Sequence, residues 1–143
     1  MSAEAVRQFV HTNILIYAHD ASAGTRHVRA KQLLAELWAQ GTGCLSIQVL
    51  QEFYVTATAK IRRPLEPETA RQRVEDLSYW IVHSPTAEDV VAAIRLQQTA
   101  RVSFWDAMVI VSAQRLECRV LWSEDLQHGQ TLDGLVISNP FAA

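Results

Sequence analysis

Apolar and polar residues follow one another along this chain in blocks that have the lengths of short strands and helices. In residues 9–20, FVHTNILIYAHD, two apolar runs flank a polar triplet, which predicts a strand that opens directly into a helix. Further apolar runs of strand length occupy residues 43–46, 80–83, 119–122 and 135–137. The 3.6-residue period predicts helices over residues 25–40, 47–61, 67–78, 86–100 and 107–116.

Residues typical of helix ends support these boundaries. Thr25 is expected to cap the helix over residues 25–40, and Gly41 is expected to end it. Pro67 suits the first turn of a helix, where its missing N–H leaves no hydrogen bond unmade. Thr86 and Asp89 have the spacing of a capping box, with Asp in place of the usual Glu.

The apolar stripes of these helices predict which faces are packed. In residues 47–61 the main stripe consists of Ile47, Leu50, Tyr54, Ala57 and Ile61. Glu52 lies nearly opposite this stripe, because two residues beyond Leu50 is about 200° around a helix. The helix over residues 107–116 is apolar all round, so it is predicted to be a buried central helix.

The regular alternation of strand and helix predicts an α/β fold. Such a chain forms a parallel sheet with right-handed crossovers and helices on both faces, in three layers. At 143 residues and 16.1 kDa, residues 1–143 are expected to form a single domain around one core.

Composition and charge narrow the function classes. A hydrophobic fraction of 49% and a charged fraction of 20% are typical of a globular protein. A net charge of −2 argues against a protein that binds nucleic acid through bulk positive charge. Any site for a polyanion is therefore expected to be local, with a few basic side chains or metal ions supplying the attraction.

Cysteine usage and hydropathy predict a cytoplasmic protein that makes no membrane contact. Cys44 and Cys118 are the only cysteines and show no CxxC spacing, so neither a disulfide scaffold nor a zinc site is indicated. The sequence has no charged and apolar leader, and no apolar run approaches the roughly 18 residues that span a bilayer.

Polar residues that could carry chemistry follow strands or open helices at one edge of the predicted sheet. They are His11, Glu52, Asp106 and Asp125. Clustered carboxylates raise one another's pKa unless a hard cation such as Mg2+ or Mn2+ neutralises them. A carboxylate-bound metal polarises a phosphoryl oxygen and activates water, which is the chemistry that phosphodiester hydrolysis needs.

Each of these positions also has an ordinary structural explanation. Asp106 could be a helix-start acid stabilised by the helix dipole. Asp125 could be a turn residue, and Glu124 competes with it for a place in the site. Asn13 could be a helix cap. Trp105 is interpreted as a core residue rather than a platform for stacking on bases.

The segments that hold these residues resemble the motifs of PIN-domain nucleases, especially the VapC-like toxins of toxin–antitoxin pairs. Residues 12–18, TNILIYA, follow the family's first motif, but His11 occupies the position of its metal-binding aspartate. The other three motifs resemble residues 51–54 (QEFY), 104–107 (FWDA) and 122–126 (WSEDL). The resemblance spans nearly the whole chain.

This resemblance implies a PIN-like fold and an endoribonuclease. It implies five parallel strands in the order 3-2-1-4-5, an RNA substrate and a cognate antitoxin that occupies the cleft. It also implies a homodimer, with residues 33–38 and 47–61 as candidate surfaces. Glu52, Asp106 and Asp125 correspond to the family's acidic Mg2+ or Mn2+ ligands, with His11 in the place of the fourth, and Asn13 corresponds to a polar residue that lines the catalytic site.

The histidine at position 11 changes the expected activity. It replaces a negative oxygen ligand with a neutral nitrogen ligand, which Mn2+ accepts more readily than Mg2+ does. Loss of even a supporting partner costs about 10- to 100-fold in metal affinity or activity. The sequence therefore predicts a metal-dependent ribonuclease whose activity His11 impairs.

Two other functions are compatible with parts of the pattern. A non-catalytic protein could keep the PIN fold and bind RNA or a protein partner, and His11 favours this alternative. A receiver-like phosphoacceptor protein also has a doubly wound fold. Such a protein needs a lone aspartate at a suitable strand end and paired acids after the first strand, and this chain does not have that combination.

Overall fold

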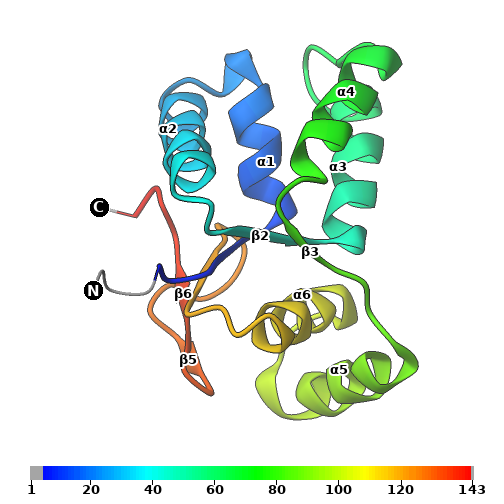
Figure 1. The fold of residues 1–143 in the computed structure, drawn as a ribbon, viewed down its shortest axis with the longest axis vertical. Helices are drawn as coiled ribbons and strands as arrows, with labels where there is room; N and C mark the ends of the chain where they lie inside the picture. Colours follow the sequence, from blue (N-terminus) through cyan, green and yellow to red (C-terminus); the bar gives the residue numbers. More distant parts are fainter. Residues whose placement is uncertain (1–4, 143) are drawn as a thin grey trace.

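The centre of the molecule is a six-stranded sheet in the order β3-β2-β1-β4-β6-β5 (Figure 1). The computed structural model describes residues 5–142. The strands are β1 (Gln8–Val10), β2 (Gly43–Ser46), β3 (Ile81–His83), β4 (Val120–Trp122), β5 (Thr131–Leu132) and β6 (Leu135–Ser138). All neighbouring strands pair in parallel except β5 and β6, which are antiparallel.

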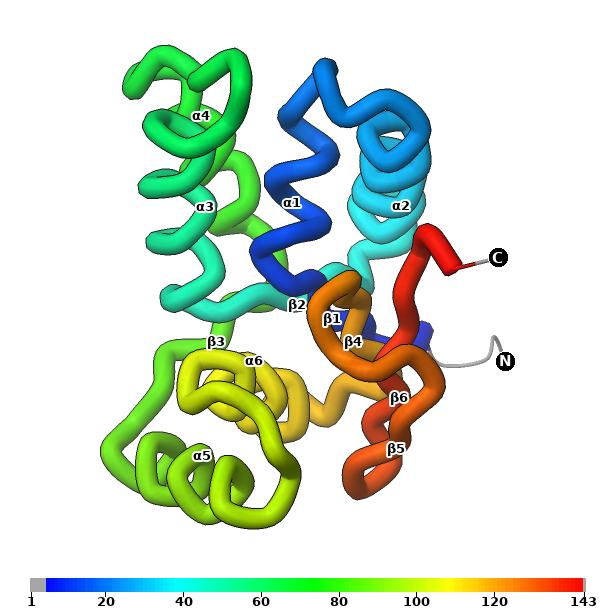
Figure 2. The backbone as a smooth tube through the Cα atoms, turned by 180° about the vertical axis from the view of Figure 1, so that it is seen from behind, coloured from blue at the N-terminus to red at the C-terminus, as the bar shows by residue number. Residues whose placement is uncertain are grey.

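Helices cover both faces of this sheet, which confirms the predicted three-layer α/β/α architecture. One face carries α1 (Thr12–His19), α2 (Thr25–Gln40), α3 (Ile47–Ala59) and α4 (Pro67–Leu77), with a short 3-10 turn, η1 (Ala21–Ala23), between α1 and α2. The other face carries α5 (Ala87–Ala100) and α6 (Phe104–Arg115). Figure 2 shows the same separation from behind. Within the described residues, no helix has the length and hydropathy to cross a membrane.

The predicted order of the five parallel strands is confirmed, but the sheet has one more strand. The parallel strands β3-β2-β1-β4-β6 correspond to the order 3-2-1-4-5. The extra strand, β5, lies between the predicted strands over residues 119–122 and 135–137, and it pairs with β6 through a hairpin. Asp133 and Gly134 form this turn, with φ of 49° and 84°. An Asp-Gly pair is a known hairpin signal, but a strand of two residues is too short to show a period.

The helix ends follow the predicted signals with one exception. Gly41 ends α2 in the left-handed conformation, with φ of 68°, and Pro67 is the first residue of α4. Thr86 and Asp89 form the predicted capping box of α5. Thr25 is not a cap, because α2 already begins at this residue and Gly24 precedes it without a side-chain hydrogen bond.

The buried face of α3 differs from the predicted stripe. Val49, Leu50, Phe53 and Ala57 are its buried residues. Ile47 and Tyr54, which the period placed in the core, are each 40% exposed. This segment is apolar over most of its surface, so its period alone does not show which face is buried. Contacts with α1 and α4 determine the buried face. Glu52 consequently lies beside buried Phe53 and is half-buried.

The central position of α6 is confirmed. Every residue from Ala107 to Ala113 is buried. The central strands are equally apolar, since Phe9, Leu45 and Leu121 are fully buried. Strands covered by helices on both faces have this continuous apolar character.

A polar network at the end of β3 connects α5 with α6. Asp89 accepts hydrogen bonds from the Thr86 N–H (2.9 Å) and from Arg115 Nε (2.7 Å), and it lies 3.3 Å from His83 Nε2. The other ring nitrogen of His83 is 2.9 Å from Ser112 Oγ. The Thr86 N–H and the Arg115 guanidinium hold the pKa of Asp89 below its ordinary value.

We expect Asp89→Asn to lower the free energy of unfolding by about 1 to 3 kcal/mol at neutral pH, because it removes a charged cap and an ion pair. A carboxyl with a lowered folded pKa stabilises the fold above its unfolded pKa, about 3.9, and loses that contribution as the pH falls further. Urea unfolding across this range should show the variant and native protein converging in acid. Glu88→Gln, an exposed acid in the same helical turn, is the control. A constant difference at every pH would contradict the assignment.

Gly43 is required by the Trp80 ring, which occupies the space that a Cβ at position 43 would fill. We expect Gly43→Ala to lower the free energy of unfolding by about 1 to 3 kcal/mol through overpacking. The same substitution in a Trp80→Ala background should cost little, because the overlap is gone. Chemical denaturation of the four proteins tests this, and an equal cost in both backgrounds would contradict it.

Candidate functional site

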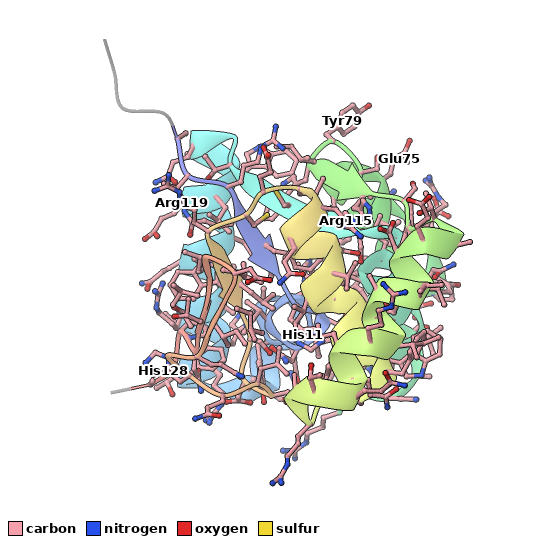
Figure 3. The ribbon with its side chains drawn as sticks, turned by 90° about the horizontal axis from the view of Figure 1, so that it is seen from below. His11, Glu75, Tyr79, Arg115, Arg119 and His128 are labelled. Carbon is pink, nitrogen blue, oxygen red and sulfur yellow. The ribbon has the colours of Figure 1, made fainter. Side chains whose placement is uncertain are left out.

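The candidate site lies where the carboxyl ends of β1 and β4 meet the first turns of α3 and α6. Phe9 pairs with Leu121 and Val10 with Trp122, so β1 and β4 end side by side. The His11 N–H then donates to the Trp122 carbonyl at 3.0 Å. Figure 3 shows His11 between α1 and α6. Polar residues that follow the two strands are therefore held against each other at the edge of the sheet.

His11 is the centre of this site. Its side chain is 7% exposed, with Nδ1 2.8 Å from Ser123 Oγ and Nε2 3.6 Å from Asp106 Oδ1. Burial lowers the pKa of His11, and the nearby charges of Asp106, Asp125 and Glu52 partly oppose this effect. The imidazole is thus neutral at pH 7, its Nδ1 is held by Ser123, and all three predicted acids lie close enough to act on it.

Asn13 connects the start of α1 to the loop after β4. Its Nδ2 donates to Asp125 Oδ2 (2.9 Å) and to Ser123 Oγ (3.2 Å), and its Oδ1 accepts from the Glu124 N–H (3.2 Å). It does not cap α1, because His11 occupies the cap position without a side-chain hydrogen bond. Asn13 therefore lines the site and orients Asp125.

Glu52 reaches the site from α3. It accepts hydrogen bonds from Thr12 Oγ1 at 3.0 Å and from Gln48 Nε2 at 3.3 Å. Gln48 Nε2 also lies 3.2 Å from the carbonyl oxygen of Trp105. Thr12 and Gln48 are site residues that were not predicted from the sequence, although Thr12 belongs to the polar triplet after β1 and Gln48 lies one turn before Glu52.

The structure separates the two neighbouring acids after β4. Glu124 points away from the site, toward Arg26 Nε (2.6 Å) and the Tyr17 hydroxyl (2.5 Å). Desolvation raises the pKa of Glu124, but the hydrogen bonds from Tyr17 and Arg26 together lower it below its ordinary value. Asp125 points toward Asn13 and is exposed at the edge of the site. Asp125, and not Glu124, shares this edge with His11.

Ser123 contacts three of the other site residues. It is fully buried, and its Oγ lies within hydrogen-bond distance of His11 Nδ1, Asn13 Nδ2 and the Asp125 N–H. In the sequence it belongs to the segment WSEDL, residues 122–126, which predicted no role for it. Its position directly after an apolar strand is the available signal, because such residues reach the sheet edge where α/β folds place their sites.

These residues do not form a metal cage as they stand. Across residues 5–142, no three His, Cys, Asp or Glu side chains come close enough to hold a metal ion. Glu52 and Asp125 instead accept hydrogen bonds from Thr12 and Asn13, Asp106 faces His11 at 3.6 Å, and the neutral ring of His11 lies where the resemblance places a carboxylate. The role of His11, Glu52, Asp106 and Asp125 as ligands stays a prediction.

The interpretation of Trp105 as a core residue is wrong. Its side chain is 61% exposed at the first turn of α6, and it contacts the Phe104 ring edge-on with the ring centroids 5.1 Å apart. The residues that follow Trp105 in α6 pack into the core. Trp105 was therefore predicted to be buried only because its neighbours in the sequence are apolar.

Comparison with solved structures shows the fold of toxin components. The chain is similar to a toxin–antitoxin complex from Klebsiella pneumoniae, with 20% identity, a TM-score of 0.70 and coverage of 95% of this chain and 99% of that one. It is similar to the DNA-bound VapBC of Salmonella typhimurium, with 18% identity, a TM-score of 0.67 and the same coverages. It is also similar to VapC20 of Mycobacterium tuberculosis, a toxin that cleaves the sarcin–ricin loop, with 20% identity, a TM-score of 0.63 and coverage of 80% and 86%.

Comparison with protein families gives a more specific result. No curated protein matches the chain. The family model of the PIN domain matches residues 9–131, a range that includes every site residue described above. The chain therefore belongs to the PIN domain family.

Proposed function

We propose that this protein is a VapC-like toxin, an endoribonuclease that hydrolyses RNA phosphodiesters with Mg2+ or Mn2+ at Glu52, Asp106 and Asp125, and whose activity is impaired by His11. Membership of the PIN family supports a nuclease. The similar toxin structures support a toxin that is paired with a cognate antitoxin. A homodimer and a cytoplasmic location belong to the same proposal.

The position of His11 is the observation that carries this proposal. The residue follows β1, is buried, and faces Asp106 at 3.6 Å with the charges of Asp125 and Glu52 nearby. A carboxylate at this place would add a fourth negative group to the three acids and would strengthen their attraction for a divalent cation. The imidazole is neutral, and its Nδ1 is already occupied by Ser123.

A non-catalytic PIN-fold protein that binds RNA or a protein partner is the second candidate. The arrangement of His11 favours it, because its Nδ1 contacts Ser123, its Nε2 faces Asp106 at 3.6 Å, and Glu52 and Asp125 accept hydrogen bonds from other residues. Such a site is stable without a cation, since it carries one negative charge fewer than a site with four carboxylates.

We expect His11→Asp to increase metal-dependent RNA cleavage by at least about 10- to 100-fold over the native chain, because it restores an oxygen ligand. Cleavage of transfer RNA and of a sarcin–ricin loop RNA is measured with Mg2+, with Mn2+ and with EDTA, which should abolish it. His19→Asp is the matched control, because His19 lies at the far end of α1 and bonds to the Leu15 carbonyl. If neither the native chain nor the His11→Asp variant cleaves RNA, the result favours the non-catalytic alternative.

The orientation of the two acids after β4 gives a second prediction. In the His11→Asp protein, we expect Asp125→Asn to lower cleavage at least about 10-fold. Glu124→Gln should leave the cleavage rate unchanged, because Glu124 bonds to Tyr17 and Arg26 outside the site.

An independent measurement checks the same orientation. The hydrogen bond to Glu124 raises the pKa of Tyr17. Glu124→Gln should therefore lower the Tyr17 pKa toward its ordinary value of about 10, as measured by phenolate absorbance. A loss of cleavage in Glu124→Gln with an unchanged Tyr17 pKa would reverse the assignment of the two acids.

A further inference from the structure

An exposed indole stands beside the site acids. Trp105 immediately precedes Asp106 in the first turn of α6, and 61% of its side chain is exposed. The Phe104 ring meets it edge-on, at an interplanar angle of 73°. Gln48 joins the Trp105 carbonyl oxygen to the Glu52 carboxylate through contacts of 3.2 and 3.3 Å. The backbone that carries the indole is thus fastened to α3 next to Glu52, and the ring itself is exposed.

A polar groove leads away from the same acids. It has a volume of about 450 Å³ and lies between the α5–α6 connection and the loop after β4. Its lining includes Arg101, Ser103, Asp106, Asp125, Gln127 and Gln130. Arg101 ends α5 in the left-handed conformation, with φ of 51°. Among the ion pairs of residues 5–142, none involves the Arg101 guanidinium.

The two features fit the parts of one nucleotide chain. An exposed aromatic ring offers a stacking surface to any unpaired base. A guanidinium without an acidic partner suits a phosphate, and side-chain amides can donate to or accept from base edges and 2′-hydroxyls. The protein is acidic overall and its site repels phosphates, so local contacts of this kind are needed to hold RNA there.

We infer that Trp105 and Arg101 form a binding site for single-stranded RNA beside the site acids, in which a base stacks on the indole and a phosphate binds the guanidinium in the groove. The inference rests on the proposed function for its substrate class and adds the residues that position the RNA. Bases in a duplex stack on each other, so they are not free to stack on Trp105. A protein partner would bury an apolar surface, whereas this groove is polar.

Binding of a labelled single-stranded RNA of mixed sequence, followed by fluorescence anisotropy in EDTA, tests the stacking contact without cleavage. We expect Trp105→Ala to weaken binding about 5- to 150-fold, the effect of losing one base–aromatic stack. Trp105→Phe should keep most of the affinity. Tyr79→Ala is the matched control, because Tyr79 is 83% exposed and projects from the surface away from His11 (Figure 3). Thermal unfolding of each variant confirms that the fold is retained.

The phosphate contact has a separate signature. We expect Arg101→Ala to weaken binding of all RNA sequences alike and to reduce the slope of log K against log salt by about 0.7, the value for one contact to a single strand. Arg119→Ala is the control, since this exposed arginine precedes β4 at the opposite edge of the sheet.

The outcomes separate this inference from the proposed function. If the Trp105 and Arg101 variants bind RNA as tightly as the native protein, the inferred site is wrong and the ribonuclease proposal is unaffected. The same holds if the native protein prefers duplex RNA. Absence of RNA binding in EDTA would also overturn it, while cleavage by His11→Asp would still uphold the ribonuclease. The expected binding pattern together with no cleavage by His11→Asp would uphold the RNA site and reject the hydrolytic function.

Discussion

The parallel pairing of β1 with β4 is the constraint on which the site depends. The two strands are far apart in the sequence, yet their registers bring His11 and Ser123 to the same edge. This is the point where the sheet order reverses direction, because β2 lies on one side of β1 and β4 on the other. Crossovers leave in opposite directions at such a point, and the gap between them is where open α/β folds hold ligands.

Electrostatics explains why a histidine can be tolerated there. Three acids near one another raise the free energy of the folded protein unless a cation or a hydrogen-bond donor offsets their charges. Here Glu52 bonds to Thr12 and Gln48, and Asp125 bonds to Asn13. The buried neutral ring of His11 adds no further negative charge. In general, a site with fewer negative charges attracts a divalent cation less strongly.

Neighbouring residues around the site differ in whether they contact other parts of the fold or are exposed to solvent. Glu124 is joined to α1 and α2 through Tyr17 and Arg26, and Arg26 also lies over the Tyr17 ring at 5.9 Å. Asp125, one residue later, remains exposed. In α6, Trp105 is exposed, whereas the residues from Ala107 to Ala113 are buried in the core. One residue of sequence therefore separates a structural role from a place in the site.

The sequence by itself determined the α/β class, most helix ends, and the edge at which His11, Glu52, Asp106 and Asp125 gather. These properties follow from local periods, caps and the alternation of strand and helix, whereas the order of the parallel strands was implied by the family resemblance. Only the tertiary structure decided the buried face of α3, the short strand β5, the opposite orientations of Glu124 and Asp125, the role of Ser123 and the exposure of Trp105. Each of these depends on partners distant in the sequence, and a local period carries no information about which distant side chain will be near.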